Sequence, residues 1–188
     1  MKIVELPREW RARAMVIRDV ELSRDRFSTE ELSIVDEFKL QKRREEWMRA
    51  RIAAKELAKI ARGEHVSFSH SGPYGGAAID VGPIGIDVEV VRPIADAAAH
   101  LFLSEEEHEA ARGCAIDDAL LHFWCAKEAA WKQRQGAVPT LKQLSLPVLG
   151  DRGFGVLFEG VETVRVDDVI IALTVERRAS ARRDEPAG

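Results

Sequence analysis

Two acidic residues, Asp87 and Glu89, lie two positions apart in the segment PIGIDVE at residues 83–89. Side chains alternate along a β-strand, so the two carboxylates point to one face while Ile86 and Val88 face the core. Carboxylates about 7 Å apart on one strand can share a hard cation such as Mg²⁺, which takes protein oxygens and a phosphate together. The alternative is a half-buried strand with one wet face.

A glutamate and a lysine form the second candidate group. Glu128 and Lys132 lie four residues apart in the segment WCAKEAAWK, residues 124–132, and therefore share one helix face. An exposed pair at this spacing contributes only about 0.2–0.5 kcal/mol, which is the plain alternative. Because Trp124 and Trp131 lie nearby, we expect a partly buried face, where a metal or a phosphate could partner the charges.

Ser69 and His70 stand at the end of a predicted strand, in the segment SFSHSG before a Gly-Pro turn. Backbone amides and an imidazole at such a strand end could bind a phosphate, although a histidine there is often structural. The other histidines form no HExxH spacing, so we do not expect a zinc site.

Three consecutive cations, Lys42, Arg43 and Arg44, fall at the start of a predicted helix. Positive charge at a helix N-terminus is unfavourable unless an anion joins it. That anion could be a ligand phosphate or an acidic partner. The alternative is a solvated basic face neutralised by Glu45 and Glu46.

The elements that must position these residues follow from periodicity and from helix and turn signals. Capping-box spacing at Ser28 and at Ser104 predicts two helix starts. The predicted strands lie at 15–20, 66–70, 76–81 and 85–90, with four more between 144 and 175. The predicted long helices lie at 42–61 and 117–135. Because both halves share the order strand, helix, helix, strands, a pseudo-duplicated α+β architecture is expected.

Composition narrows the class of protein. With 28 Lys and Arg against 32 Asp and Glu in 188 residues, the net charge is −4, which argues against general nucleic-acid binding. No apolar run reaches the roughly 18 residues of a membrane helix, and no signal-peptide pattern begins the chain. Cys114 and Cys125 lack a CxxC spacing, so we expect a reduced, cytoplasmic enzyme.

Three motifs, in this order and at this spacing, resemble those of the 4′-phosphopantetheinyl transferase superfamily, in its surfactin-synthetase-activating branch. They are FSHSG at 68–72, IGIDVE at 84–89 and WCAKEAAWK at 124–132. The segments 102–107 and 46–57 are also similar to family segments, so the resemblance covers roughly residues 30 to 150. A departure from the pattern lies before residue 66, where this branch usually has a Gly-Lys-Pro-like segment and this chain has RGEH.

The resemblance implies an enzyme that transfers the 4′-phosphopantetheine group of coenzyme A to a serine of an apo-acyl or apo-peptidyl carrier protein, with release of 3′,5′-ADP. It implies Asp87, Glu89 and Glu128 as Mg²⁺ ligands. Glu128 would also be the base for the serine, and Lys132 would contact the diphosphate. The implied coenzyme A contacts are Lys42, Arg43, Arg44, Ser69, His70 and Lys132.

The same resemblance implies a fold of two similar α/β halves with the site at their junction. We expect an N-terminal half at residues 1–82, a C-terminal half at 83–177 and a flexible tail at 178–188. A monomer is expected, as a pseudo-dimer within one chain, with no nucleic-acid or membrane partner. Carrier proteins of this kind are typically acidic, so Arg49 or Arg51 of the basic run at 39–51 could contact the partner.

Two alternatives remain at this point. One is a non-catalytic relative that binds coenzyme A or a carrier protein, and the other is a different Mg²⁺-dependent phosphoryl-transfer enzyme.

Overall fold

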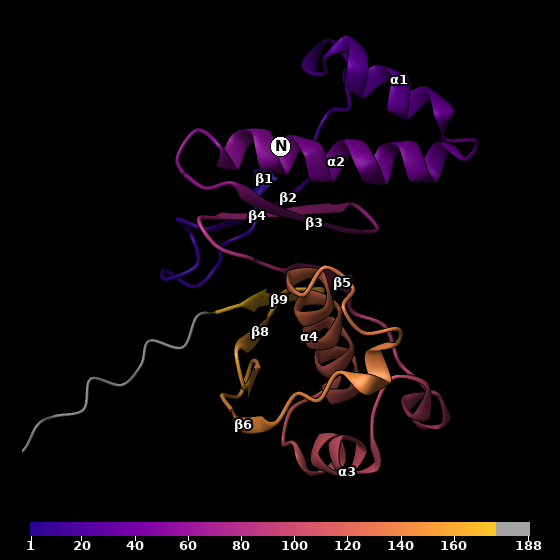
Figure 1. Ribbon diagram of the computed structural model, residues 1–188, viewed down its shortest axis with the longest axis vertical. Helices are drawn as coiled ribbons and strands as arrows, with labels where there is room; N and C mark the ends of the chain where they lie inside the picture. Colours follow the sequence, from indigo (N-terminus) through magenta and orange to yellow (C-terminus); the bar gives the residue numbers. More distant parts are fainter. Residues whose placement is uncertain (176–188) are drawn as a thin grey trace, which may run out of the picture.

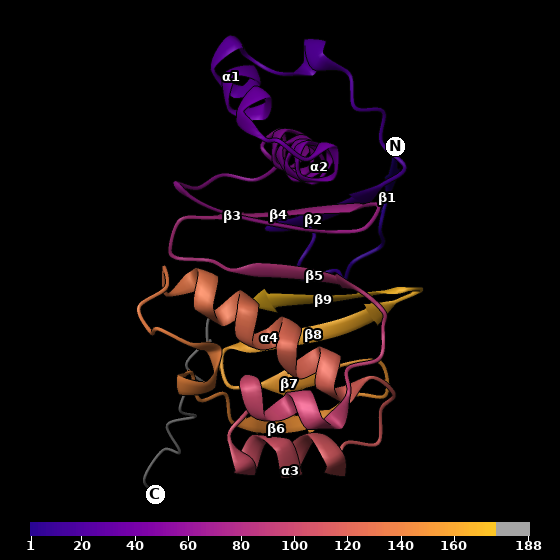
Figure 2. The same ribbon diagram turned by 90° about the vertical axis from the view of Figure 1, so that its right-hand side faces the viewer.

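The computed structural model describes residues 1–175 and contains two antiparallel sheets, each with a long helix against one face (Figures 1 and 2). The four-stranded sheet has the order β1-β2-β4-β3, and the five-stranded sheet has the order β5-β9-β8-β7-β6. The predicted mixture of helix and sheet is confirmed. The duplication of the two halves and their boundary at residue 82 stay predictions, and the expected tail at 178–188 lies outside the described residues.

The first sheet is formed by the N-terminal part of the chain. Its strands are β1 (Lys2–Ile3), β2 (Ala14–Arg18), β3 (His65–Ser71) and β4 (Tyr74–Asp80). The strand predicted at 15–20 ends earlier, because Asp19 has a positive φ of 51° that turns the chain out of the sheet. The turn between β3 and β4 contains Gly72 with φ +52°, a conformation that glycine adopts without strain.

Helices α1 (Thr29–Glu37) and α2 (Gln41–Leu57) follow β2. Ser28 begins α1 with the predicted capping box, since its hydroxyl accepts from the backbone of Glu31 and the Glu31 carboxylate accepts from the backbone of Ser28. The α2 helix ends at Leu57, before the predicted Ala61, and a turn follows. Its apolar face, with Met48, Ile52, Ala53 and Leu57, packs on β2 and β4. Gly75 permits this close approach, because a Cβ there would lie 2.4 Å from the backbone of Arg49.

The second sheet contains β5 (Ile86–Val90) and the four strands predicted between 144 and 175. These are β6 (Val148–Asp151), β7 (Val156–Phe158), β8 (Val161–Val166) and β9 (Val169–Thr174). Three short 3₁₀ segments, η1 (Arg24–Arg26), η2 (Asp96–Leu101) and η3 (Leu141–Gln143), lie in the connections. No helix among residues 1–175 has both the length and the apolar character needed to cross a membrane.

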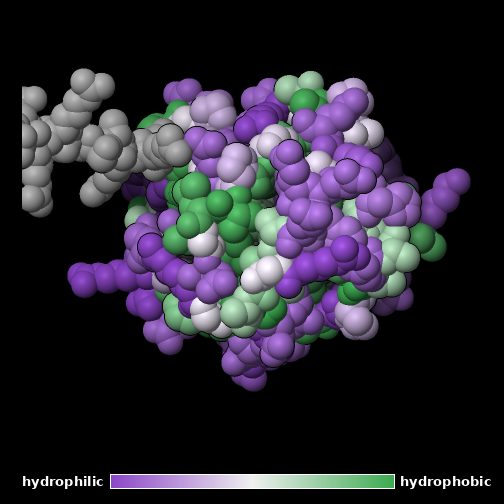
Figure 3. All heavy atoms as spheres, turned by 90° about the horizontal axis from the view of Figure 1, so that it is seen from below, coloured by the Kyte–Doolittle hydropathy of each residue, from purple (hydrophilic) through white to green (hydrophobic). Residues whose placement is uncertain are grey.

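Two helices belong to this second unit, α3 (Glu105–Gly113) and α4 (Ala119–Gln133). The capping box predicted at Ser104 is confirmed. The α4 helix begins two residues later than predicted, because Asp118 adopts a left-handed conformation with φ 59°. Gly85 lets the start of β5 contact α4 directly, since a Cβ there would lie 1.9 Å from the Ala129 carbonyl oxygen. This contact places the acidic strand against the helix that carries Lys132. The end of the molecule near α3, seen from below in Figure 3, is mostly hydrophilic with smaller hydrophobic areas.

Three clusters of buried hydrophobic residues fill the spaces between the helices and the sheets. One lies between α2 and the first sheet, and another lies between α4 and the second sheet. The third joins the two sheets and contains Val16, Tyr74 and Ala78 from the first with Ile86, Val88, Ile171 and Leu173 from the second. Ile86 and Val88 therefore face the core, as predicted. Asp87 and Glu89, which alternate with them along β5, point toward α4.

A buried ion pair ties α3 to α4. The ammonium of Lys127 is 2.6 Å from Oε2 of Glu107, and their side chains are 0% and 8% exposed. Lys127 also donates to the carbonyl oxygens of Leu141 and Leu144, at 3.1 and 2.8 Å. The pair therefore anchors the loop after α4, and breaking it would leave a buried charge without its counterion.

We predict that Glu107→Ala lowers the free energy of unfolding by about 3–5 kcal/mol, because an uncompensated ammonium would remain buried. Urea denaturation checks this value. Glu106→Ala, an exposed neighbour in the same helix turn, is the control and should change stability by less than about 0.5 kcal/mol. Equal effects of the two substitutions would contradict the role given to the pair.

His122, in α4, is another buried titratable group. It is 1% exposed, and its Nδ1 is 2.8 Å from Oγ1 of Thr163 in β8. Burial lowers the pKa of His122 to about 4, and the charge of Arg165 contributes in the same direction. The folded protein therefore holds this imidazole neutral, whereas the unfolded chain protonates it near pH 6.5.

We predict an acid-dependent loss of stability from His122. Between pH about 6.5 and about 4 the unfolded chain binds a proton that the folded chain does not, so stability falls as the pH falls, by about 3 kcal/mol in total. Urea unfolding at a series of pH values measures the slope, which should flatten in His122→Gln. The exposed His100, changed to Gln, should leave the slope as it is. An unaltered slope in His122→Gln would rule out this assignment.

Candidate functional site

Asp87, on β5, is the most buried of the predicted site carboxylates. Its side chain is 6% exposed, and Oδ1 accepts from Nζ of Lys132 at 2.6 Å and from Oγ of Ser69 at 2.8 Å. Within residues 1–175, the second oxygen, Oδ2, is buried and accepts no hydrogen bond from a nitrogen or hydroxyl donor. Burial raises the pKa of the Cys125 thiol in α4, and the charge and hydrogen bond of Asp87 raise it further, so this thiol also contacts the carboxylate.

Glu89 points to the same face of β5 as Asp87, as its spacing predicted, and both of its oxygens have partners. Oε2 accepts from Oγ of Ser71 at 2.9 Å, and Oε1 accepts from the indole Nε1 of Trp124 at 3.2 Å. The guanidinium of Arg92 lies 3.7 Å from Oε1. Burial raises the pKa of Glu89, and the negative charge of Asp87 raises it further, while Ser71, Arg92 and Trp124 oppose this in part.

Lys132, on α4, contacts Asp87 rather than Glu128. Its ammonium donates to Asp87, to Oγ of Ser69 at 3.3 Å and to the carbonyl oxygen of Ile86 at 3.1 Å. Burial lowers the pKa of Lys132, but the attraction and hydrogen bond of Asp87, together with the negative charge of Glu128, outweigh burial, so the pKa is raised. The simple Glu–Lys helix pair considered from the sequence is therefore not formed.

Glu128 shares the half-buried face of α4 with Lys132. Burial raises the pKa of its carboxyl group, and the negative charge of Asp87 raises it further, while Lys132 lowers it. Within residues 1–175 we find no ion pair or hydrogen bond of this carboxylate. A half-buried carboxylate of raised pKa is suited to accept a proton, which is the property of a general base.

The three carboxylates do not form a preassembled metal cluster. Among residues 1–175, no group of three or more His, Cys, Asp or Glu side chains is close enough to hold a metal ion. The prediction of Asp87, Glu89 and Glu128 as Mg²⁺ ligands therefore stays a prediction. Their oxygens are nonetheless the donors that Mg²⁺ prefers.

Ser69 and His70 point to opposite faces of β3. The Ser69 hydroxyl is buried at Asp87, where it donates to the carboxylate and accepts from the backbone of Val88 at 3.1 Å and from Lys132. His70 turns toward α2, with Nδ1 3.7 Å from Oε2 of Glu46. Burial lowers the pKa of His70, although Glu46 partly offsets this effect. The predicted phosphate contacts of both residues stay predictions.

Lys42 and Arg43, at the start of α2, lie close to Glu46, for which the sequence predicts only a solvated counter-charge. Glu46 is 6% exposed, and its carboxylate lies 3.6 Å from Lys42 and 3.5 Å from Arg43, as well as near His70. Arg44 donates to the carbonyl oxygen of Phe38 at 2.8 Å. The spacing of Glu46 from Lys42 was a usable signal, but the contact with His70 required the packing of α2 on β3.

The two arginines expected at a partner surface make contacts within the protein. Arg49 donates to Glu45 at 2.8 Å, and its side chain is 18% exposed. The Arg51 guanidinium lies 3.6 Å from the ring centroid of Phe68 and 4.7 Å from that of Trp47. The more exposed cations of this helix are Lys42 and Arg43, with side chains 80% and 61% exposed.

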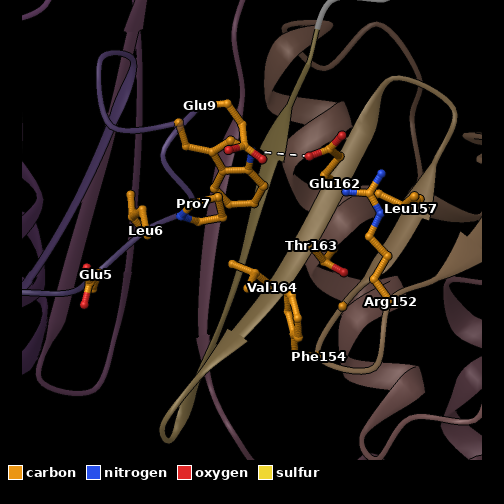
Figure 4. Close-up of a pocket in the computed structure, with 12 residues that line it drawn as sticks. Glu5, Leu6, Pro7, Glu9, Arg152, Phe154, Leu157, Glu162, Thr163 and Val164 are labelled. Carbon is orange, nitrogen blue, oxygen red and sulfur yellow. Dashed lines mark hydrogen bonds between the residues drawn. The ribbon is translucent and has the colours of Figure 1, made fainter.

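A pocket of about 300 Å³ lies elsewhere, between the loop after β1 and strands β7 and β8 (Figure 4). Trp10 lines it and donates from Nε1 to Glu162 at 3.4 Å, while Arg152 and Phe154 come from the loop before β7. None of the predicted site residues lines this pocket. The candidate site is therefore the polar cluster at β3, β5 and α4.

Comparison with known proteins agrees with the motifs. Residues 83–165 match the model of the 4′-phosphopantetheinyl transferase superfamily, so the resemblance inferred from the sequence is confirmed for this part of the chain. Asp87, Glu89, Glu128 and Lys132 all lie inside the matched segment.

Curated relatives include 4′-phosphopantetheinyl transferases of Bacillus. The chain is 36% identical over 87 residues to the transferase ffp of Bacillus subtilis, which covers 45% of this chain and 36% of that protein. It is 37% identical over 87 residues to Sfp of Bacillus subtilis strain 168, covering 45% of this chain and 36% of Sfp. The match to psf-1 of Bacillus pumilus is 37% over 68 residues, or 35% and 29% of the two chains. The matched segment thus spans about a third of these relatives.

We predict that Lys132 is coupled more strongly to Asp87 than to Glu128. A double-mutant cycle with Asp87→Asn and Lys132→Met should give a coupling on the order of 2 kcal/mol in the free energy of unfolding. The matched cycle with Glu128→Gln and Lys132→Met should give at most about 0.5 kcal/mol, the value of an exposed helix pair. The reverse ranking would contradict the ion-pair assignment and restore the simple helix pair.

Proposed function

We propose that the protein is a 4′-phosphopantetheinyl transferase that acts on coenzyme A and on a serine of an apo-acyl or apo-peptidyl carrier protein. The observation that carries the proposal is the Asp87–Lys132 ion pair inside the segment that matches the superfamily. The names of the Bacillus relatives support the same activity.

The proposed reaction is a transfer of one phosphoryl group. The carrier serine Oγ forms a bond to the phosphorus that bears pantetheine, and the bond from that phosphorus to the bridging diphosphate oxygen breaks. The products are the phosphopantetheinyl serine and 3′,5′-ADP. The serine proton goes to Glu128, whose half-buried position and raised pKa suit a general base.

Asp87, Glu89 and Glu128 would hold a Mg²⁺ ion, whose charge would stabilise the negative oxygens of the diphosphate. The donor chemistry fits, because all three side chains supply oxygens and Oδ2 of Asp87 accepts no hydrogen bond from a nitrogen or hydroxyl donor of residues 1–175. Lys132 holds Asp87 in place and supplies a further positive charge for the diphosphate.

The coenzyme A phosphates would be bound from the first sheet and α2. Lys42 and Arg43 are exposed near His70, and Arg44 lies in the same turn of α2. Ser69 lies beside Lys132. In this proposal Glu46 keeps Lys42, Arg43 and His70 close to one another before the phosphates arrive. A duplicated α+β fold, with the site where its halves meet, agrees with the contact of Ser69, Asp87 and Lys132 where β3 meets β5 and α4.

The test is incubation of the protein with coenzyme A, Mg²⁺ and a panel of apo-carrier proteins, followed by intact-mass analysis. The expected result is a carrier whose mass increases by one phosphopantetheinyl group, together with free 3′,5′-ADP. A carrier with its acceptor serine changed to alanine is the control. Binding of coenzyme A without transfer would favour a non-catalytic relative, and phosphate release without a carrier would favour a different phosphoryl-transfer enzyme.

We predict that transfer requires a divalent cation and is abolished in Asp87→Ala, while Glu128→Gln lowers kcat about 100-fold with little change in KM for coenzyme A. Lys132→Ala should lower kcat and raise KM for coenzyme A, because the lysine charge contacts phosphates in both the ground state and the transition state. Glu106→Gln, on an exposed face of α3, is the matched control. Full turnover in excess chelator, or a near-normal rate in Glu128→Gln, would remove these assignments.

A further inference from the structure

Three serines of β3 join the two sheets. Ser67, Ser69 and Ser71, here named the serine ladder, alternate along the strand, and each Oγ accepts a hydrogen bond from a backbone N–H of β5. The donors are Ile86, Val88 and Val90, each at 3.1 Å. Because β3 and β5 are edge strands of different sheets, these N–H groups have no backbone partner from β3, and the serine hydroxyls satisfy them.

Two rungs of the serine ladder also hold the site carboxylates. A serine hydroxyl has one donor and two acceptor positions, so it can accept from a backbone N–H and donate to a carboxylate at once. Ser69 donates to Asp87 at 2.8 Å, and Ser71 donates to Glu89 at 2.9 Å. Ser67 makes the same contact with β5, but the structure gives its hydroxyl no carboxylate partner.

We propose that Ser71 is a positioning residue that fixes the orientation of the Glu89 carboxylate. Glu89 is held at Oε2 by Ser71 and at Oε1 by the indole of Trp124, so the two contacts together define the plane of its carboxylate. Trp124 comes from α4 and Ser71 from β3, so the orientation of the Glu89 carboxylate depends on how α4 and the first sheet are placed relative to each other. As far as transfer activity is concerned, this inference rests on the proposed function.

The serine ladder supplies its own control. Ser71→Ala removes one contact between the sheets and the donor to Glu89, whereas Ser67→Ala removes an equivalent contact between the sheets and no donor to a carboxylate. Ser71→Thr keeps the hydroxyl and should restore the wild-type behaviour. Since Ser71 is only half-buried, the alanine variant should fold.

The first readout needs no activity. The Trp124 indole N–H, identified in NMR spectra by its loss in Trp124→Phe, should exchange with solvent about tenfold faster in Ser71→Ala, because its acceptor is no longer fixed. The rate should stay at the wild-type value in Ser67→Ala and in Ser71→Thr. An unchanged rate in Ser71→Ala, or an equal increase in Ser67→Ala, would overturn the proposal.

The second readout is transfer to a carrier protein. We expect kcat to fall about tenfold in Ser71→Ala, with little change in KM for coenzyme A, and to recover in Ser71→Thr. Equal losses in Ser71→Ala and Ser67→Ala would assign the serine ladder to stability alone and overturn positioning. If the wild-type protein transfers nothing, the proposed function fails, and the indole exchange rates alone decide the role of Ser71.

Discussion

The joint between β3 and β5 is the constraint on which the candidate site depends. Both strands lie at sheet edges, and an edge strand carries backbone groups that must be paired or hydrated. Here serine hydroxyls of β3 pair with the N–H groups of β5 in regular alternation. The same hydroxyls contact Asp87 and Glu89, so the connection between the sheets and the orientation of the carboxylates are one arrangement.

This arrangement places negative charge where water is scarce. Burial raises the pKa of both Glu89 and Glu128, and each of these carboxylates is also repelled by Asp87. Lys132 offsets part of this repulsion through its contact with Asp87. One ammonium faces three carboxylates, so repulsion from Asp87 adds to burial in raising the pKa values of the two glutamates.

The site combines a part of the chain that matches the superfamily with a part that precedes the match. Residues 83–165 contribute Asp87, Glu89, Glu128 and Lys132, whereas Ser69, His70 and Ser71 come from β3. The first sheet therefore contributes more than a platform for α2. Its strand β3 supplies hydrogen-bond donors to two of the carboxylates. Among residues 1–175, β3 is also the only strand of the first sheet whose side chains form hydrogen bonds with β5.

Local features could be predicted from the amino-acid sequence, because periods of two and about 3.6 residues place neighbouring side chains on one face. The common face of Asp87 and Glu89, both capping boxes and the four strands after residue 144 follow from such short-range rules. Only the tertiary structure decided which groups meet. Ser69 and Asp87 are 18 positions apart and Asp87 and Lys132 are 45 apart, so their contacts depend on how β3 and α4 pack against β5. For that reason the spacing of Glu128 and Lys132 indicated a shared helix face, while the partner of Lys132 was set by a strand that approaches α4 closely at Gly85.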